Sequence, residues 1–397
     1  MMSVWSSLVG QGDAVAKLSE AAASARAIVA SRAGSAARED ARSMSHAWLI
    51  TGPPGSGRSV AARAFAAALQ CTGEEVGCGT CPGCRTTMGR TNADVLFAAT
   101  ETSIINVETA RSLVLQAQSS PSQGLWRVIV VEDADRLGEA GANALLKAIE
   151  EPPEHTVWLL CAPSPEDMIA TIRSRCRHLG LRIPTANAVA DLLVREGVAT
   201  PEVALEAARA AQSHIGLARA LAADPEMRAR RRAIVTAPVS VRSVGEAVLA
   251  ADRLLETAKA QADAQVSERN AREKAELLRQ LGMEEDERAT KASRTLIRQL
   301  EEDQKRRSKR ALTDAIDRAL IDLLAIYRDV LMTQVGGDGE LINTDLADLV
   351  RSIADESTPR QTLSRVDHIE TARRRLKSNG NTLLVLEDMA ISLRPQA

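Results

Sequence analysis

The sequence predicts an α/β fold followed by an all-α region, in which a doubly wound parallel sheet precedes helical domains. Two observations carry this prediction. Short apolar runs alternate with helical patterns as far as Leu181, which is typical of parallel strands joined by crossover helices. Six of the seven aromatic residues lie in the first 160 residues, so the later part of the chain must pack with alanine and leucine.

The 397 residues exceed one ordinary domain, and changes of pattern near two prolines divide them. We expect an α/β domain over residues 1–182, a small helical domain over 183–238 and a C-terminal helical domain over 239–397. Within the last domain, 23 of the 44 residues from Ser267 to Arg310 are charged, with both signs present. This predicts a solvated helical insertion at about 267–310, of one or two arms. An insertion with little function is the simpler interpretation.

Composition narrows the class of protein. The net charge of −2 gives no general attraction to nucleic acid, and scarce aromatics argue against a base-stacking platform. Residues Met1–Ser6 lack the charged and apolar regions of a signal peptide, and no apolar run has the length of a membrane span. We therefore expect a cytoplasmic location.

A phosphate-binding loop follows the first apolar run, Ala47–Ile50. Its glycines allow backbone amides to approach phosphate oxygens, and Ser59 would offer a hydroxyl to Mg²⁺. Arg58 stands where the motif has lysine; it keeps the charge but spreads it over a wider fork, which weakens clamping of a transition state. The loop residues expected at a nucleotide are Gly52, Gly55, Gly57, Arg58 and Ser59.

An acidic pair follows a second apolar run, Trp126–Val131. ATPases with this loop end that strand in Asp-Glu, whereas here the order is Glu132-Asp133. A displacement of about 1 Å in a catalytic group can cost on the order of 10²-fold in rate. Together with Arg58, this predicts weak or absent ATP hydrolysis by the chain itself.

Four cysteines are clustered with metal-site spacing: Cys71, Cys78, Cys81 and Cys84. Two C-x2-C steps and a fourth thiol match a structural tetrathiolate zinc site. Unrelated buried thiols or disulfides are the alternatives. Cys161 and Cys176 lie elsewhere and are expected in the core or at strand ends.

The sequence resembles bacterial clamp-loader subunits of the AAA+ superfamily over about residues 4–182. Within that family it is most similar to the delta-prime type of the DNA polymerase III holoenzyme, of actinobacterial character, because the gamma/tau type keeps the lysine and the Asp-Glu order. The stretches that carry the resemblance are the four-cysteine knuckle, Leu8–Gln11, Ser45–Gly52, Asn143–Pro153 and Thr171–Cys176.

The resemblance implies roles for single residues. Arg175 would be an arginine finger that reaches the ATP site of a neighbouring subunit; without the resemblance, a solvated arginine is the simpler interpretation. Val9 and Gly10 would lie near an adenine pocket, and Arg219 would belong to a sensor-2-like helix.

The position known as sensor 1 in this family lies at the end of a strand. Ala162-Pro163 occupies the strand end where the family has hydroxyl side chains, which makes Ser164 the nearest candidate.

The resemblance also implies an architecture and partners. The three segments would be an ATPase-like module, a lid and a collar in a five-subunit ring with gamma/tau and delta. The ring would load the sliding clamp onto primer-template DNA, and polymerase chemistry would belong to the whole assembly. The expected cofactors are structural Zn²⁺ and ATP or ADP with Mg²⁺. The alternatives are an active gamma/tau-like ATPase and a regulatory AAA+ protein outside replication.

Overall fold

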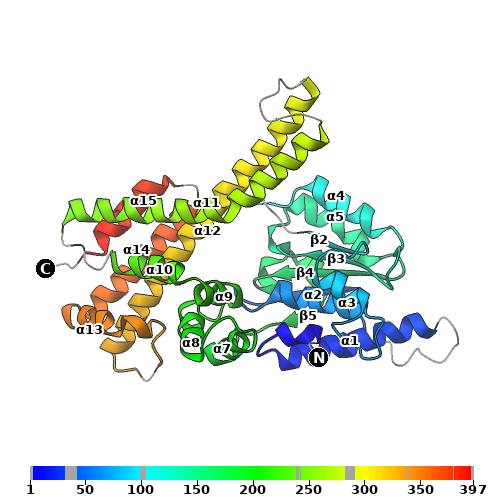
Figure 1. The fold of residues 1–397 in the computed structure, drawn as a ribbon, viewed down its shortest axis with the longest axis horizontal. Helices are drawn as coiled ribbons and strands as arrows, with labels where there is room; N and C mark the ends of the chain where they lie inside the picture. The colour runs from blue at the N-terminus through cyan, green and yellow to red at the C-terminus, as the bar shows by residue number, and fades with distance from the viewer. Residues whose placement is uncertain are drawn as a thin grey trace. The chain divides into compact units, whose positions relative to one another are not determined.

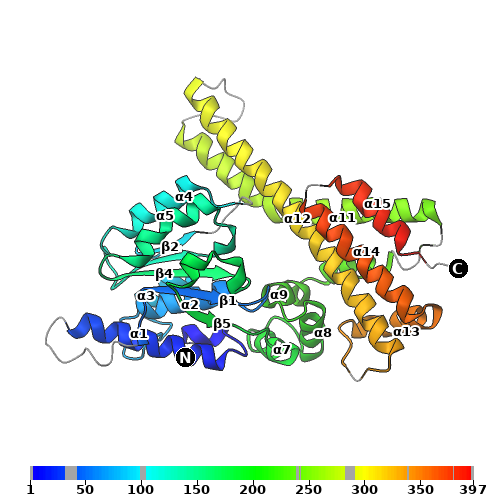
Figure 2. The same cartoon turned by 180° about the vertical axis from the view of Figure 1, so that it is seen from behind.

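The computed structural model describes residues 3–31, 43–98, 104–237, 241, 243–281, 291–337, 339–378 and 380–394. The chain forms two compact units, Met1–Arg219 and Ala220–Ala397, seen from two sides in Figures 1 and 2. The domain boundaries expected near residues 183 and 239 stay predictions.

The first unit contains all strands of the described residues. Its elements, in chain order, are η1 (Val4–Ser7), α1 (Gly12–Ser31), β1 (Ala47–Thr51), α2 (Arg58–Leu69), α3 (Pro82–Met88), β2 (Val95–Ala98), α4 (Val107–Ala117), β3 (Arg127–Val131), η3 (Ala134–Arg136), α5 (Glu139–Glu150), β4 (Thr156–Ala162), η4 (Pro165–Asp167), α6 (Ala170–Arg173), β5 (Arg177–Gly180), α7 (Ala186–Arg195), α8 (Pro201–Ala210) and α9 (Ile215–Ala223), the last of which crosses into the second unit.

The second unit is helical in its described residues, and no described helix has the length and apolar content needed to cross a membrane. Its elements are α10 (Pro225–Thr236), α11 (Val244–Gln280), α12 (Lys291–Gln334), η6 (Thr344–Leu346), α13 (Ala347–Glu356), α14 (Pro359–Lys377) and α15 (Thr382–Ser392).

The five strands form one parallel sheet in the order β2-β3-β4-β1-β5. β1 pairs with β4 on one side and with β5 on the other, and every residue of β1 and β4 is buried. Such burial is expected of a parallel sheet that is covered on both faces. Because the strands run in one direction, the loops after them meet at the same edge of the sheet.

Helices cover both faces of this sheet, with α1 and α2 on one face and α4 and α5 on the other (Figures 1 and 2). Trp48 of β1 packs edge to face on Phe65 of α2, with ring centroids 5.3 Å apart. Leu49, the next residue, joins the opposite core together with Leu145 of α5. The predicted class, a parallel α/β sheet followed by a helical region, is confirmed.

α3 and α10 are among the helices that the sequence pattern did not predict. α3 begins directly after Cys81, whose Sγ accepts a hydrogen bond from the Cys84 N–H, so a helix start coincides with the metal-ligand pattern. α10 buries Arg231 beside Val235, and an arginine at a buried position interrupts the apolar period that reveals a helix.

In the second unit, α11 and α12 are long helices that lie side by side (Figures 1 and 2). A small apolar cluster of Ala262, Val266 and Ala311 joins them. Farther along, Arg307 donates to Asn270 at 2.7 Å and to Glu273 at 2.9 Å. The charged segment is thus helical over residues 267–280 and 291–310 and is held by polar contacts.

A buried carboxylate anchors the chain between α12 and α13. Asp329 accepts hydrogen bonds from the Ile342 and Asn343 amides, at 3.1 and 2.8 Å, and from Asn343 Nδ2 at 2.9 Å. Arg231 of α10 donates to Asn343 Oδ1 at 2.6 Å and pairs with Asp322. This network explains why an arginine is buried in α10.

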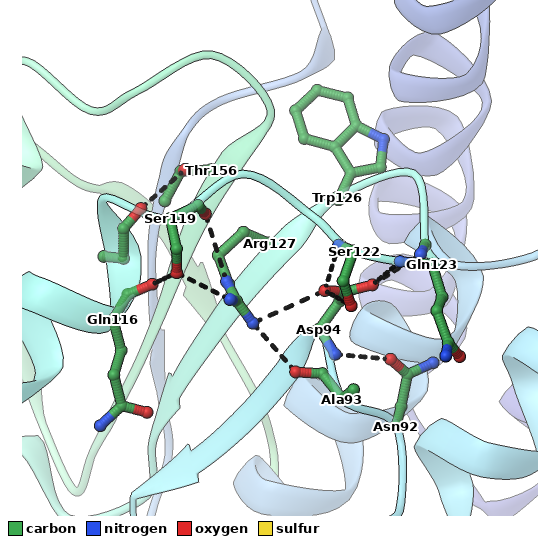
Figure 3. A network of polar contacts seen from close by, with 12 residues as sticks. Asn92, Ala93, Asp94, Gln116, Ser119, Ser122, Gln123, Trp126, Arg127 and Thr156 are labelled. Atoms are coloured by element: carbon green, nitrogen blue, oxygen red, sulfur yellow. Dashed lines mark hydrogen bonds and ion pairs between the residues drawn. The ribbon is translucent and has the colours of Figure 1, made fainter.

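A second buried carboxylate, Asp94, holds the loop between α4 and β3 (Figure 3). Its two oxygens accept the backbone N–H groups of Ser122, Gln123 and Gly124 at 2.6–2.7 Å, and Arg127 lies 3.6 Å away. Burial acts to raise the pKa of the Asp94 carboxyl, but these donors outweigh it and the pKa lies below its ordinary value.

We predict that Asp94→Asn destabilises the first unit by about 2–4 kcal/mol at neutral pH. The asparagine side chain places its NH₂ group against backbone N–H groups, where the carboxylate accepts hydrogen bonds. A carboxyl whose folded pKa is depressed stabilises fully above its unfolded pKa of about 3.9, and this contribution is lost as pH falls through the folded pKa. Urea unfolding of both proteins should show a difference that is constant above about pH 5 and shrinks below about pH 4. An equal difference at every pH would contradict this role for the ionised form.

Candidate functional site

The phosphate-binding loop joins β1 to α2 at the carboxyl edge of the sheet. Gly55 and Gly57 have φ values of +89° and +88°, which favour glycine, and Gly57 caps the N-terminus of α2. A side chain at Gly55 would also lie 3.0 Å from the Cα of His214, which precedes α9. The glycine pattern therefore reflects both backbone conformation and close approach.

Three hydrogen bonds hold this loop in place. The Gly52 N–H donates to the Pro163 carbonyl at 3.1 Å, after β4. Arg58 Nη1 donates back to the Gly52 carbonyl at 2.8 Å, so the residue in the lysine position fastens the loop itself. Gln11 Nε2 donates to the Ser56 carbonyl at 3.3 Å.

Gln11 is a site residue that sequence reasoning missed, although it ends the stretch Leu8–Gln11. It is buried, and it joins three segments that are far apart in the chain. Besides Ser56, it bonds Arg182 twice, donating to its carbonyl at 2.5 Å and accepting from its N–H at 3.2 Å. Gln11 therefore links the N-terminal segment, the phosphate-binding loop and the chain that leads to α7.

The acidic pair lies at the same edge as the loop. Glu132 forms an ion pair with Arg90 at 2.5 Å, and the Arg90 guanidinium lies 5.0 Å from the ring centroid of Phe97. Burial and the charge of Arg90 lower the pKa of Arg63 in α2, while Glu132 acts in the opposite sense. Arg90 and Arg63 had no signal in the sequence that tied them to Glu132.

The two motifs influence the same buried groups. Burial raises the pKa of Cys161, at the end of β4, to about 12, with Glu132 and Asp133 adding to the rise and Arg58 opposing it. Burial and Asp133 likewise raise the pKa of Asp135, while Arg136 and Arg58 act to lower it. The glycine loop and the acidic pair thus act on the same buried groups.

The remaining residues expected at the nucleotide lie as follows. Gly10 has a φ of +69°, and a side chain there would lie 3.3 Å from Pro184; Val9 beside it is half-buried. Arg219 in α9 forms a bidentate pair with Glu196, with its shortest contact at 2.6 Å. Its partner in this structure is therefore a carboxylate at the end of α7.

Ser164, the nearest hydroxyl to the expected sensor-1 position, caps η4. Its Oγ accepts the Glu166 N–H at 3.1 Å and its own N–H donates to Asp167 at 2.9 Å. These bonds give Ser164 a local capping role in the structure.

Arg175 lies between α6 and β5, at the amino edge of the parallel sheet. The phosphate-binding loop is at the carboxyl edge, so Arg175 and the chain's own loop are at opposite edges. The Arg175 side chain is 38% exposed, forms an ion pair with Glu150 at the end of α5, and donates from Nη1 to the Thr171 carbonyl at 2.8 Å.

The four clustered cysteines can hold a metal ion. Their Sγ atoms all lie within 4.8 Å of one another, with Cys71 3.7 Å from Cys78 and 3.9 Å from Cys81. Four thiolates at about 2.3 Å from a tetrahedral ion would be separated by about 3.8 Å. All six cysteines of the chain are free thiols, so the disulfide alternative is wrong for this structure.

The electrostatics of these thiols are uneven. Burial acts to raise the pKa of Cys81, but hydrogen bonds from the Cys84 and Thr72 backbone lower it to about 6. Burial raises the pKa of Cys84. A bound cation would favour thiolate at all four sulfurs.

The cysteine knuckle is also bonded to the N-terminal segment. The Val4 N–H donates to the Gly77 carbonyl at 3.0 Å, and Ser3 Oγ donates to the same oxygen at 3.0 Å. Arg26 of α1 donates to the carbonyls of Glu74 and Cys71, at 2.9 and 3.0 Å. The knuckle and Gln11 thus fix opposite ends of the segment 3–11.

Two protein-family models match the chain. The model described as DNA polymerase III, delta subunit, matches residues 35–185, and the model described as DNA polymerase III, delta subunit, C terminal, matches residues 287–394.

The curated relatives are subunits of DNA polymerase III. DNA polymerase III subunit gamma/tau of Mycobacterium tuberculosis is 35% identical over 162 residues, which are 39% of this chain and 28% of the relative. DNA polymerase III subunit delta' of Escherichia coli is 33% identical over 189 residues, 47% of this chain and 57% of the relative. The chain therefore spans little more than half of the delta' relative and less than a third of the gamma/tau relative.

A solved structure, a DNA polymerase III gamma subunit-related protein from Thermotoga maritima, is similar with a TM-score of 0.43 and 17% identity. The match covers 87% of this chain and 93% of that one.

We predict that Gln11→Ala loosens the phosphate-binding loop, because it leaves the Ser56 and Arg182 carbonyls without their side-chain donor. The expected cost is about 1–3 kcal/mol in unfolding free energy. Amide hydrogen exchange should rise near residues 56 and 182, whereas Gln116→Ala on the exposed face of α4 should change neither. Unchanged exchange in the Gln11 variant would show that the loop holds its shape without this side chain.

Proposed function

We propose, from the matches to DNA polymerase III delta-subunit models and to delta' relatives, that the chain is a clamp-loader subunit that assists a neighbouring ATPase rather than acting as the motor. In this role it donates Arg175 to the neighbour's ATP site. The complex, a five-membered ring with gamma/tau and delta subunits, then loads the sliding clamp onto primer-template DNA. The actinobacterial assignment stays a prediction.

The observation that carries this proposal is the position of Arg175. It lies at the opposite sheet edge from the chain's own phosphate-binding loop, so its charge is available only to a site on another molecule. Glu150 and the Thr171 carbonyl hold the guanidinium while its side chain stays 38% exposed. An exposed ion pair is worth about 0–1 kcal/mol, so a partner's phosphate can displace Glu150 at little cost.

The chain's own loop is suited to holding a nucleotide rather than hydrolysing it. Arg58 is bonded to the Gly52 carbonyl, and Glu132 is bonded to Arg90. A lysine in the first position would reach the terminal phosphates, and a free carboxylate in the second would act on Mg²⁺ and water. We expect ATP or ADP to bind with little or no turnover.

An active gamma/tau-like ATPase is the second candidate. Identity does not decide between the two, since the gamma/tau and delta' relatives are 35% and 33% identical to this chain. The altered loop and acidic pair favour the non-motor role. Rapid hydrolysis by the isolated chain that disappears in Ser59→Ala would favour the ATPase instead. A regulatory protein outside replication would not copurify with other loader subunits.

The arginine finger is tested in the reconstituted complex. In Arg175→Ala, the hydrolysis rate at the ATP site that Arg175 contacts should fall on the order of 10³-fold. The total turnover of the complex should then fall by the fraction that this site contributes. Arg175→Lys should fail similarly because lysine lacks the planar fork. The matched control is Arg173→Ala, an exposed arginine two residues away. Full turnover in Arg175→Ala would remove this residue from the proposed role.

We also propose that the cysteine knuckle binds structural Zn²⁺, because all four ligands are thiolates and no ligand position is left for water. Through the Val4–Gly77 and Arg26–Cys71 bonds, the ion would fasten the N-terminal segment to the sheet unit.

We predict stoichiometric zinc in the wild-type chain and a loss of zinc in Cys78→Ser, measured by elemental analysis. The same variant should exchange the Val4 amide faster, because the Gly77 carbonyl that it bonds is no longer held by the ion. Cys176→Ser, outside the knuckle, should keep both the zinc and the slow exchange. A wild-type chain prepared without chelators that contains no zinc would refute the site.

A further inference from the structure

The carboxylate that an ordinary phosphate-binding loop would present to Mg²⁺ is already paired in this chain. In related sites the metal is held by the loop hydroxyl and the acid after the neighbouring strand, here Ser59 and Glu132. Glu132 is only 14% exposed, and its Oε1 lies 2.5 Å from Arg90 Nη2. A divalent cation at that oxygen would have to compete with the charge of the arginine.

Arg90 is held in this position by more than the ion pair. It follows α3 with a φ of +58°, and its N–H donates to the Thr87 carbonyl at 3.0 Å. Its guanidinium lies 5.0 Å from the centroid of the Phe97 ring in β2, within the range of a cation–π contact. The arginine is therefore positioned by backbone, ring and carboxylate together.

A second arginine shares the same carboxylate environment. Arg63 of α2 is half-buried; burial and the charge of Arg90 lower its pKa, and Glu132 acts in the opposite sense. Arg90 and Arg63 thus both act at the Glu132 carboxylate. Adding a divalent cation to such a cluster is electrostatically unfavourable, whereas an anion is attracted to it.

Among the described residues, the buried donors without a hydrogen-bond partner include Arg63 Nε and the Ser56 hydroxyl inside the loop. A buried donor without a partner costs free energy, which a bound phosphate oxygen or a water would recover. Arg63 Nε fits an anion and does not fit Mg²⁺, because a guanidinium has donors and no acceptor.

From this arrangement we infer that the phosphate-binding loop takes the phosphate chain of a nucleotide without a divalent cation, with Arg90 and Arg63 supplying the positive charge that a metal would bring. The inference rests on the proposal that the loop holds a nucleotide. It adds that this binding is independent of Mg²⁺, which also explains how a nucleotide could be held without being hydrolysed.

The test measures ADP and ATP binding to the full chain by calorimetry, once with excess Mg²⁺ and once with EDTA. For the wild type, the two dissociation constants should agree within about threefold, because the charge of the site comes from the chain. In Arg90→Ala, Glu132 faces the phosphates unpaired, so binding in EDTA should weaken by about tenfold or more and Mg²⁺ should restore it.

Two further variants make the result specific. Arg90→Ala combined with Glu132→Gln removes both charges and should return binding to metal independence. Arg85→Ala, on the exposed face of α3, should behave as the wild type. Thermal melts establish that each variant is folded.

Wild-type binding that needs Mg²⁺ would overturn the inference, and so would a chain that binds neither nucleotide in either condition. Both outcomes are distinct from a failure of the proposed function. A chain that binds no nucleotide can still assemble with loader subunits and donate Arg175, which the reconstituted complex measures separately.

Discussion

The structure depends on the burial of β1 between β4 and β5. This strand is enclosed on both faces and both sides, so the loop that follows it can extend only from the carboxyl edge of the sheet. At that edge the backbone of neighbouring segments fixes it: the Gly52 N–H bonds Pro163, and the Leu181 N–H bonds Thr51 at 2.7 Å. The shape of the phosphate-binding loop therefore follows from sheet order, and its chemistry is left to the side chains around it.

The two edges of the sheet each carry an arginine–carboxylate pair, and the two pairs differ in exposure to solvent. At the carboxyl edge, Arg90 covers a carboxylate that is mostly buried. At the amino edge, Arg175 and Glu150 are 38% and 42% exposed. Water screens the second pair and weakens it, whereas the first is less open to exchange. The Arg90–Glu132 pair thus keeps the Glu132 carboxylate neutralised at the chain's own site. The Arg175–Glu150 pair can open, so that Arg175 becomes available to a partner.

Local sequence patterns predicted the parts of the fold that depend on local physics. The apolar runs Ala47–Ile50 and Trp126–Val131 form strands with ends within one residue of the runs, because such runs fit a parallel sheet that is covered on both faces. The four cysteines were expected to converge, and their sulfur atoms do.

What the patterns could not predict depends on pairing between distant residues. Nothing near Glu132 in the sequence identifies Arg90 as its partner, and nothing near Gln11 indicates Arg182. α10 was not predicted for a related reason. Its Arg231 can be buried because it bonds Asn343 and pairs with Asp322, which lie more than ninety residues later in the chain. Such contacts are decided by tertiary packing, and local periodicity carries no record of them.

The bond between Gln11 and Arg182 has a consequence for synthesis on the ribosome. The two residues are 171 positions apart, so at roughly 5–20 residues per second the nascent Gln11 waits about 10–30 s for its partner. β1 waits as well, because its neighbours in the sheet, β4 and β5, are translated later. The loop expected to hold a nucleotide is thus made early but takes its final form only after Arg182 has been translated. During that interval the apolar strand before it lacks its two neighbours in the sheet and is exposed to aggregation.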